Sequence, residues 1–385
     1  MQKAIVLAAG ASSRFWPLAS MHHKVFYKVG EGKTILEYTV SGLLQNAEEI
    51  ELVVGPVDEE RAKKLFEDES RVKIHVLPSP TGEGNAVLAG LPEGYLGQFF
   101  VTGGDKIFAG KLLEKLSVEK EAIAVRKTDD AKNFGITELD SEGNIISIEE
   151  KPENPKSDIK ITSAYLLDSE ILGLLKKNTS EHYSLEISLN EYFKDRKVKG
   201  VSVDDVPDTQ LKFPWDLIDL NKKLMEEEKV EFVHPSAKVS EKAKLKPPYY
   251  IGENALVGDF ALVRDCAFID SNVVVGAHSE VKNSLLYEGV TIHRAYVGDS
   301  VIDSVSKVGG GAILANKRYD RGIVKSMMKD GKVETGKKTL GAIIGMGASI
   351  GVNASIMPGV KVGNKSIVWP GKVQVEDVQD AETSK

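Results

Sequence analysis

The sequence is poor in cysteine and has no long apolar run. Its single thiol, Cys266, excludes an internal disulfide framework and a zinc cluster built on cysteines. No apolar stretch reaches the length that crosses a bilayer. Met1 to Lys3 also lead directly into an apolar segment, without a cleavable small-residue site. We therefore expect a cytoplasmic protein that does not enter a membrane.

An excess of positive charge is missing as well. The 50 Lys and Arg residues are outnumbered by 57 Asp and Glu residues, which leaves a formal net charge of −7. A surface of this sign argues against nucleic acid and anionic membranes as partners. Any phosphate ligand must therefore be bound by a few local cations. The 385 residues, 42% of them hydrophobic, are sufficient for two domains with sizeable cores.

The sequence up to about residue 225 alternates short apolar segments with amphipathic ones. This pattern predicts strands at 3–8, 50–54, 73–77, 98–103 and 121–126, and helices at 34–46, 58–68, 84–91 and 110–117. Such a βαβ series forms a Rossmann-like α/β domain with a mostly parallel sheet, whose ligands lie beyond the carboxyl ends of the strands. Arg14 and Asp105 both follow such ends, so we expect them near one cleft.

From Val233 the pattern changes to a strict period of six residues. Aliphatic residues recur at Val233, Val239, Leu245, Ile251, Val257, Val263, Ile269, Val275 and Val281, and again at Ile344, Ile350, Ile356, Val362 and Val368. This repeat predicts a parallel β-helix, and it resembles the left-handed β-helix of hexapeptide-repeat proteins, in which three repeats make one triangular coil. Residues 315–340 break the period and are expected to form a loop outside the coil. We place a boundary near residue 230, between domains at 1–229 and 230–385, after a helical segment at 217–228.

The loop after the first strand has the composition of a phosphate-binding site. Ala8 to Ala11 are small and let the main chain approach a ligand, while Arg14 and Lys24 can hold a triphosphate. Asp105 follows two glycines at the end of a strand, where a carboxylate can reach a divalent ion. On spacing alone, these residues could also be an ordinary first turn and an aspartate that caps the next helix.

Residues 7–19 resemble the signature of sugar-1-phosphate nucleotidyltransferases, Leu-Ala-Ala-Gly-x-Gly-x-Arg-x-x-Pro-Leu-Thr followed by Pro-Lys. Matching segments at 81–87, 133–135, 148–152 and 214–217 extend the resemblance. The family implies that Arg14 and Lys24 hold the triphosphate and Asp105 holds Mg²⁺, while the sugar phosphate attacks the α-phosphate and pyrophosphate leaves. It also implies nucleotide contacts from Leu7, Ala9, Gly10 and Gly82, and sugar contacts from Gly135, Glu150 and Lys151.

Several positions depart from the family pattern. The departures are Ser12 for the second glycine, Ala19 for the threonine, His23 for the proline before the lysine, Leu77 and Pro80 near the position of a missing glutamine, and Thr162-Ser163-Ala164 for an asparagine-glycine pair. The family's second metal carboxylate aligns with Gln210, unless a shift brings in Asp208. Base choice, metal affinity and the preferred sugar are therefore open.

A second candidate site surrounds His293, where the strict period relaxes. A lone histidine is usually structural or exposed, although this side chain is well suited to proton abstraction at neutral pH. The stretch from His293 to Asp299 resembles the His-x-x-Tyr-x-Gly-Asp motif in the acetyltransferase half of bifunctional N-acetylglucosamine-1-phosphate uridylyltransferases, especially the archaeal type. The resemblance implies that His293 takes a proton while the amine of glucosamine-1-phosphate attacks the thioester of acetyl-CoA.

The same resemblance assigns residues around this histidine. It implies sugar-phosphate contacts from Arg264, Lys282 and Tyr296, acetyl-CoA contacts from Asn316 and Lys325, and a homotrimer with the coenzyme between subunits. Arg264 and Lys282 are 18 residues apart, which stacks them on one face of an 18-residue coil. Lys307 in place of an asparagine and Gly322 in place of a lysine depart from the pattern.

Three functions are compatible with these observations. The first is a bifunctional enzyme that acetylates glucosamine-1-phosphate and then couples the product to UTP or dTTP, giving UDP-N-acetylglucosamine or a relative. The second is a glucose-1-phosphate uridylyl- or thymidylyltransferase with a structural β-helix. The third is a non-catalytic regulatory homologue that binds nucleotide sugars. Departures such as Ser12 favour the third function, but the retained Arg14, Lys24 and Asp105 argue against it, and we favour the first.

Overall fold

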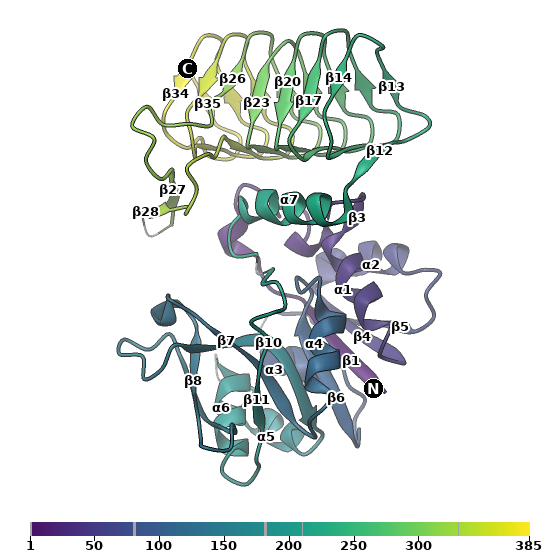
Figure 1. Cartoon of the computed structure of the whole chain (residues 1–385), viewed down its shortest axis with the longest axis vertical. Helices are drawn as coiled ribbons and strands as arrows, with labels where there is room; N and C mark the ends of the chain where they lie inside the picture. Colours follow the sequence, from purple (N-terminus) through teal and green to yellow (C-terminus); the bar gives the residue numbers. More distant parts are fainter. Residues whose placement is uncertain (1, 80–81, 181–182, 210, 330) are drawn as a thin grey trace. The chain divides into compact units, whose positions relative to one another are not determined.

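The computed structural model describes residues 2–79, 82–180, 183–209, 211–329 and 331–385 (Figure 1). The chain splits into two compact units that do not follow chain order. The first unit comprises Met1–Ala11, Met21–Phe26 and Thr34–Gln210, and the second comprises Ser12–Ser20, Tyr27–Lys33 and Leu211–Lys385. The boundary near residue 230 stays a prediction. Within the described ranges, no helix combines the length and the apolar character needed to cross a bilayer.

A mainly parallel sheet forms the centre of the first unit. Its strands lie in the order β11, β7, β10, β6, β1, β4, β5. Their bounds are β1 (Lys3–Ala8), β4 (Glu49–Val54), β5 (Val72–Val76), β6 (Gln98–Gly103), β7 (Ala122–Lys127), β10 (Ile159–Asp168) and β11 (Lys199–Ser202). The five strands expected from the sequence are all present, each within a residue or so of its predicted bounds.

One central strand, β10, was not predicted and runs antiparallel between β6 and β7. It also pairs at Lys160 with the hairpin of β8 (Gly135–Leu139) and β9 (Ile145–Glu150). Because β10 is antiparallel, its first residues lie at the carboxyl ends of β6 and β7. This reversal brings side chains from distant parts of the sequence to the edge where a parallel sheet binds ligands.

Helices complete the first unit and flank its sheet. They are α1 (Ile35–Leu43), α2 (Glu59–Leu65), α3 (Glu83–Ala89), α4 (Ala109–Leu116), α5 (Ile171–Lys177) and α6 (Ser184–Tyr192), with single 3-10 turns at η2 (Lys24–Phe26), η3 (Pro56–Asp58) and η4 (Ala131–Asn133). A capping box explains the start of α1: Thr34 Oγ1 accepts from Glu37 N, and Glu37 Oε2 accepts from Thr34 N at 2.6 Å. The four helices expected from the sequence are confirmed, although α1 and α2 are shorter than predicted.

The packing of α1 against α4 gives a testable prediction. A Cβ atom on Gly110 would lie 2.3 Å from the carbonyl oxygen of Gly42, so Gly110→Ala must push the two helices apart. We expect the variant to lose about 2 kcal/mol of unfolding free energy in urea titrations. Gly173→Ala on α5 is the matched control, because a Cβ atom added there would meet no neighbouring atom within 4 Å. The unfolding free energy of the control should rise by about 0.5–1 kcal/mol, because alanine is a better helix former than glycine. Equal changes in unfolding free energy at both sites would contradict the packing argument.

Most of the second unit is a parallel β-helix (Figure 1). Its three ladders, as far as the chain is described, follow α7 (Asp216–Glu228). The first ladder holds β12 (Glu231–Val233), β15 (Tyr249–Ile251), β18 (Ala267–Ile269), β21 (Leu285–Leu286), β24 (Val301–Ile302), β29 (Ile343–Ile344) and β32 (Lys361–Val362). The second holds β13 (Lys238–Val239), β16 (Leu256–Val257), β19 (Val274–Val275), β22 (Thr291–Ile292), β25 (Lys307–Val308), β30 (Ser349–Ile350), β33 (Ile367–Val368) and β35 (Thr383–Ser384). The third holds β14 (Lys244–Leu245), β17 (Leu262–Arg264), β20 (Glu280–Lys282), β23 (Tyr296–Gly298), β26 (Ile313–Leu314), β31 (Ser355–Ile356) and β34 (Val373–Gln374).

The predicted six-residue period forms the core of these coils. From Ile251 onward its aliphatic positions are buried, and Val263 pairs with Val281 one coil later. Val233 at the start is exposed. The arrangement is that of the predicted left-handed β-helix, and the fold class is confirmed for both parts of the chain.

The coils shorten where the period relaxes. Thr291 pairs with Lys307, so this coil is sixteen rather than eighteen residues long. Serine hydroxyls accept backbone N–H groups from the next coil: Ser300 N donates to Ser284 Oγ at 3.0 Å in a shortened coil, and Ala342 N donates to Ser300 Oγ at 3.0 Å across the insertion. Buried backbone groups must be hydrogen-bonded, and these serines satisfy them where the length of the coil departs from eighteen residues.

The predicted loop at 315–340 contains regular structure. β27 (Lys325–Met328) and β28 (Gly331–Glu334) pair antiparallel and extend from the β-helix (Figure 1). The expectation of an excursion from the coil is correct, because Ile302 pairs directly with Ile344 across the whole insertion. The hairpin itself was not predicted.

Two N-terminal segments belong to the second unit. The first, Ser12–Ser20, contains η1 (Ser13–Phe15), and the second, Tyr27–Lys33, contains β2 (Lys28–Val29) and leads into the short β3 (Lys33–Thr34). Tyr27 Oη donates to Asp303 Oδ2 at 2.8 Å, and its ring lies 4.8 Å from that of Tyr287. Trp16 Nε1 donates to Asp380 Oδ1 at 3.1 Å. Residues close to the start of the chain are thus integral parts of the β-helix unit.

Candidate active sites

The carboxyl edge of the first unit's sheet brings Lys24 and Asp105 together. β1 and β6 are neighbours with Leu7 opposite Gly103, and Gly104 N donates to Leu7 O at 2.9 Å. This pairing fixes Asp105 just beyond the end of β6. Lys24 Nζ donates to Asp105 Oδ2 at 2.7 Å, and the aspartate is buried. The sequence placed both residues near one phosphate site, and the structure joins them by an ion pair.

The electrostatics of Asp105 keep its carboxylate ionised. Burial alone would raise the pKa of Asp105, but the nearby ammonium groups of Lys24 and Lys106 outweigh it and lower the pKa to about 2. Within the described residues, no group of three or more His, Cys, Asp or Glu side chains could hold a metal ion. A lone buried carboxylate still fits Mg²⁺, which commonly takes one or two carboxylates and completes its shell with water and substrate phosphates.

Lys24 is positioned by the residue that departs from the family pattern. His23 opens η2: its carbonyl accepts from Phe26 N at 3.1 Å, and its own N–H donates to Asp58 Oδ2 at 3.0 Å. Burial, followed by the charge of Lys24, lowers the pKa of His23 to about 4. The imidazole is therefore neutral at physiological pH and adds no charge beside the lysine.

Arg14 lies on η1 within Ser12–Ser20, the segment that packs with the second unit, and its side chain is exposed. Ser12 occupies the family's glycine position with φ 49° and ψ 27°, a left-handed conformation that glycine adopts more easily. This left-handed conformation explains why the family has glycine at this position, and Ser12 adopts it as well. The role of Arg14 stays a prediction.

The two predicted sugar-binding segments are neighbours. Gly135 on β8 lies opposite Glu150 on β9, and a Cβ atom on Gly135 would come within 2.9 Å of Glu150 Oε2. Lys151 N donates to Phe134 O at 3.0 Å, and Lys151 Nζ pairs with Glu150 Oε1 at 3.3 Å. The sequence named these residues from separate motifs, and the hairpin places them side by side.

Gly82 ends the loop before α3, with φ 115°, a conformation that favours glycine. Ala9 is partly buried, and the neighbouring Gly10 is exposed. Thr81, Pro80 and Gln210, named in the sequence comparison, lie outside the described residues. Trp215 is buried and stacks on Phe213 at 4.7 Å, as expected for a packing residue.

Glu83, directly after Gly82, was missed by the sequence analysis. The residue as a whole is exposed, but desolvation of its carboxyl group, followed by the charges of Glu186, Asp105 and Glu150, raises the pKa of Glu83 above its usual value, against the opposing effect of Lys106. The signal was a carboxylate within the segment that resembles a base-binding motif. The charges of Glu186, Asp105 and Glu150 thus act on Glu83 without forming a cluster of metal ligands among the described residues.

The raised pKa of Glu83 predicts a pH-dependent stability. An acid with a higher pKa in the folded state stabilises the fold fully below its unfolded value of 4.5, and this contribution is lost as pH rises to about 7. Glu83→Gln removes the effect, and because the residue is exposed and solvent screens its charge, the unfolding free energy of the variant should exceed that of the parent by no more than about 1 kcal/mol at pH 7.5 and by less at pH 5. Urea titrations at both values test this, with the exposed Glu67→Gln as control. If the difference in unfolding free energy between Glu83→Gln and the parent is the same at both pH values, the pKa of Glu83 is not raised.

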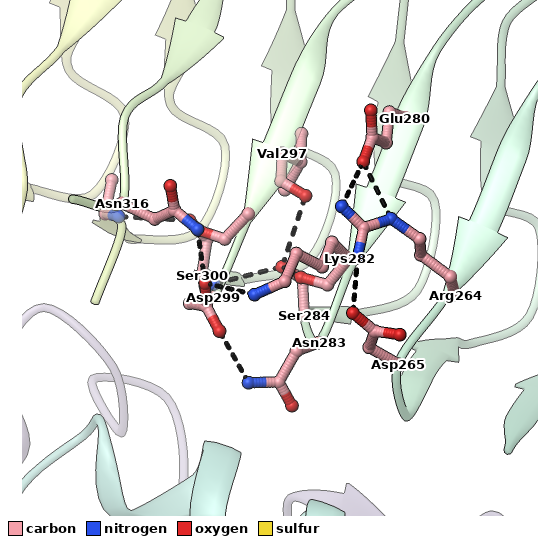
Figure 2. A network of polar contacts seen from close by, with 12 residues as sticks. Arg264, Asp265, Glu280, Lys282, Asn283, Ser284, Val297, Asp299, Ser300 and Asn316 are labelled. Atoms are coloured by element: carbon pink, nitrogen blue, oxygen red, sulfur yellow. Dashed lines mark hydrogen bonds and ion pairs between the residues drawn. The ribbon is translucent and has the colours of Figure 1, made fainter. Parts of the chain in front are cut away.

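A buried aspartate organises the candidate site of the second unit (Figure 2). Asp299 accepts from Lys282 Nζ at 2.8 Å on Oδ2 and from Asn283 Nδ2 at 2.7 Å on Oδ1. Asn316 Nδ2 also donates to Asp299 Oδ2. The predicted sugar-phosphate ligand Lys282 and the predicted coenzyme ligand Asn316 thus share one carboxylate. Asp299 closes the His-x-x-Tyr-x-Gly-Asp motif, but the sequence analysis gave it no role.

Gly298 allows Tyr296 to join this network. A Cβ atom there would lie 2.5 Å from Tyr296 Oη and 2.8 Å from Asn316 Nδ2, so a larger residue would separate them. Burial raises the pKa of Tyr296, aided by the charges of Glu280 and Asp299. His293 lies at the preceding turn with an exposed side chain, and its backbone N–H donates to Val308 O at 3.0 Å.

Arg264 lies opposite Lys282 in the ladder, one coil earlier. Its guanidinium donates to Glu280 Oε1 from Nε at 2.8 Å and from Nη2 at 2.6 Å, and it also pairs with Asp265 (Figure 2). Lys325 is not part of this network as described: it lies on β27 and pairs with Glu334 at 3.3 Å. The stacking of the two cations therefore exists, while the contacts proposed for Lys325 stay a prediction.

Comparisons with known proteins identify the class of this chain and then its family. Residues 3–205 match the nucleotidyl transferase family. Over 96% of its length the chain is 33% identical to the Bifunctional protein GlmU of Methanocaldococcus jannaschii, of which it covers 93%. It is 29% identical, over 98% of both chains, to a bifunctional sugar-1-phosphate nucleotidylyltransferase/acetyltransferase of Sulfurisphaera tokodaii. A glucose-1-phosphate thymidylyltransferase of Neisseria gonorrhoeae is 31% identical over 48% of this chain and 68% of its own.

The chain belongs to the family of bifunctional GlmU proteins. The resemblance found in the sequence is therefore confirmed over nearly the whole chain, and membership in a family of enzymes argues against a non-catalytic homologue. The roles of the individual site residues are proposals, which follow.

Proposed function

We propose that this protein acetylates glucosamine-1-phosphate with acetyl-CoA and then transfers a nucleotidyl group from UTP or dTTP to the product, releasing pyrophosphate. The observation that carries the second reaction is the buried, ionised Asp105 paired with Lys24 at the carboxyl edge of the sheet. The full-length similarity to bifunctional relatives supports the presence of both activities in one chain.

For nucleotidyl transfer, the chain's own residues position and neutralise charge. Lys24 exchanges its contact with Asp105 for a contact with the triphosphate, and Arg14 provides a second cation. Glu150 and Lys151 hold the sugar so that its phosphate oxygen faces the α-phosphate in line with the departing pyrophosphate. Mg²⁺ held by Asp105 supplies charge neutralisation on the phosphates when bound. No side chain forms a covalent intermediate.

For acetyl transfer, the proposed base is His293. Its imidazole accepts a proton as the amine nitrogen of the sugar forms the new bond to the acetyl carbon, and the bond to sulfur breaks with release of the coenzyme thiol. Lys282 and Arg264 hold the sugar phosphate, with Tyr296 beside them. Asn316 supports the charge that develops on the carbonyl oxygen. Asp299 keeps Lys282 and Asn316 in place.

Two assays test the proposal on the unmodified protein. Free thiol is measured with acetyl-CoA and glucosamine-1-phosphate, and pyrophosphate is measured with Mg²⁺, each nucleoside triphosphate and a panel of sugar 1-phosphates. We expect thiol release and a preference for UTP or dTTP with N-acetylglucosamine-1-phosphate. The absence of either product under all conditions would refute the corresponding half.

One observation favours a second candidate, a uridylyl- or thymidylyltransferase with a structural β-helix. Arg264 is already occupied by Glu280 and Asp265, so a sugar phosphate must displace one of them. Pyrophosphate release with glucose-1-phosphate, combined with no thiol release, would establish this alternative.

We further propose a cytoplasmic homotrimer in which acetyl-CoA binds between subunits, near Lys325 and Asn316. This proposal rests on the resemblance to the family. Sedimentation of the protein with and without acetyl-CoA tests it, and a monomer under both conditions would refute it.

A further inference from the structure

Three basic side chains surround Asp208 in the first unit. Lys160 Nζ lies 2.8 Å from Asp208 Oδ2, Lys106 Nζ lies 3.7 Å from Oδ1, and Arg126 Nε lies 4.0 Å from Oδ2. One carboxylate thus faces three cations. Burial by itself would raise the pKa of Asp208, but Lys106, Lys160 and Arg126 lower it below its usual value.

The fold explains why these cations meet. Lys106 follows the end of β6, Arg126 lies near the end of β7, and Lys160 lies near the start of the antiparallel β10. Lys160 and Arg126 are direct partners in the ladder between β10 and β7. Like charges at opposed positions destabilise a sheet unless an anion lies between them. The cluster is therefore built around an anion.

The group is largely shielded from water. The side chains of Lys106, Lys160 and Arg126 are 9%, 10% and 14% exposed, whereas that of Asp208 is 30% exposed. Arg126 Nε is buried and has no hydrogen-bond partner among the described residues, while its two terminal nitrogens donate to the carbonyls of Asp204 and Val206. The carboxylate of Asp208 is thus the most exposed member of the cluster.

The cluster adjoins the candidate catalytic carboxylate. Lys106 directly follows Asp105, and Thr209 Oγ1 donates to Asp105 O at 3.2 Å. Lys106, Arg126 and Asp208 line a small pocket together with Thr162 and Thr209, and while the Asp208 carboxylate is in place this pocket has room for little more than one water molecule. It lies at the ligand-binding edge of the sheet.

We propose that Lys106, Arg126 and Lys160 form a binding site for a phosphoryl anion, which takes the place of the Asp208 carboxylate. The anion is the phosphate of the sugar 1-phosphate or the released pyrophosphate. This inference rests on the proposed nucleotidyl transfer for the identity of the anion. Two oxygens of a phosphoryl group bind the lysines, and a third accepts a hydrogen bond from Arg126 Nε, which makes none with the described residues.

The same arrangement argues against Asp208 as a second metal ligand. Three nearby cations repel a divalent ion, and the carboxylate is already bound by Lys160. The chain therefore uses fixed cations here, where the family resemblance implied a metal carboxylate.

Binding of inorganic phosphate to Asp208→Asn tests the proposal. The variant removes the competing carboxylate, so its affinity for phosphate should rise about tenfold over the parent in titration calorimetry with EDTA at constant ionic strength. Asp205→Asn is the matched control, since Asp205 lies on the same loop and pairs with the surface residue Lys115 at 2.8 Å. An equal affinity for phosphate in Asp208→Asn and the control would overturn the inference.

A second variant keeps the test decisive if Asp208→Asn does not fold. Lys106→Gln should weaken phosphate binding at least about fivefold, while Lys111→Gln on the outside of α4 should not change it. Equal binding by both lysine variants would refute the site. Titrations with pyrophosphate and with glucosamine-1-phosphate show which of the two anions the site binds. The affinity for that anion must rise and fall among the variants as the affinity for inorganic phosphate does. These measurements need no turnover, so a failure of the proposed reactions is seen separately.

Discussion

Asp105→Asn is expected to reduce Mg²⁺-dependent pyrophosphate release by about 100-fold or more, because it removes the carboxylate, now paired with Lys24, that we propose as the Mg²⁺ ligand. The carboxamide keeps the shape of the side chain but binds Mg²⁺ weakly. It also removes the ion pair between this side chain and the ammonium group of Lys24. The rate is measured with saturating UTP and N-acetylglucosamine-1-phosphate, over a Mg²⁺ titration.

The control for this experiment is Asp205→Asn, which removes a surface aspartate from the same unit. It should keep the activity of the parent. Thiol release in the acetyl-transfer assay should also persist in Asp105→Asn, because that site lies in the β-helix. Equal pyrophosphate release by Asp105→Asn and the parent would show that this carboxylate does not act in nucleotidyl transfer.

His293→Ala is expected to reduce thiol release from acetyl-CoA by about 100-fold or more, the usual contribution of a general base. The exposed side chain lies on the turn before β23 and makes no packing contact that its loss would disturb among those described. Added imidazole should restore part of the rate, since a small base can occupy the space left by the side chain. Pyrophosphate release should be unchanged.

The matched control is His234→Ala, which removes a histidine of the same unit that bonds to Ser236. It should retain full acetyl transfer. If His293→Ala and His234→Ala release thiol at the same rate, His293 is not the base, and the β-helix serves the structural role of the second candidate function.

The sequence analysis predicted most of the fold because its signals are local. A buried aliphatic strand such as β1 and the six-residue period of the coils each repeat over a short window. The antiparallel β10 was missed, since its direction depends on pairing with β6 and β7, which are distant in sequence. The shortened coils were visible only as a weakened period, because the serine hydroxyls that satisfy them act between coils.

The candidate sites divide in the same way. Lys24 and Asp105 were found because each ends a recognisable motif, and the sheet then brought them together. Lys160 and Arg126 belong to no motif, and only the ladder between their strands shows that they face each other. Asp299 was visible in a motif, but its partners lie in other coils: Lys282 and Asn283 come from the preceding coil and Asn316 from the following one.

The packing of Tyr27 and Trp16 within the β-helix unit limits how this protein can be divided. A gene fragment that stops near residue 230 would keep Tyr27 but remove Asp303 and Tyr287, so the buried Tyr27 would lose its hydrogen bond to Asp303 and its contact with the ring of Tyr287. Arg14 lies in the same N-terminal segment as Trp16, Ser12–Ser20. The second unit therefore contains segments from both ends of the sequence. A foreign β-helix grafted onto this chain would remove the residues against which Trp16 and Tyr27 pack. Recombination of such proteins must carry both ends of the gene together.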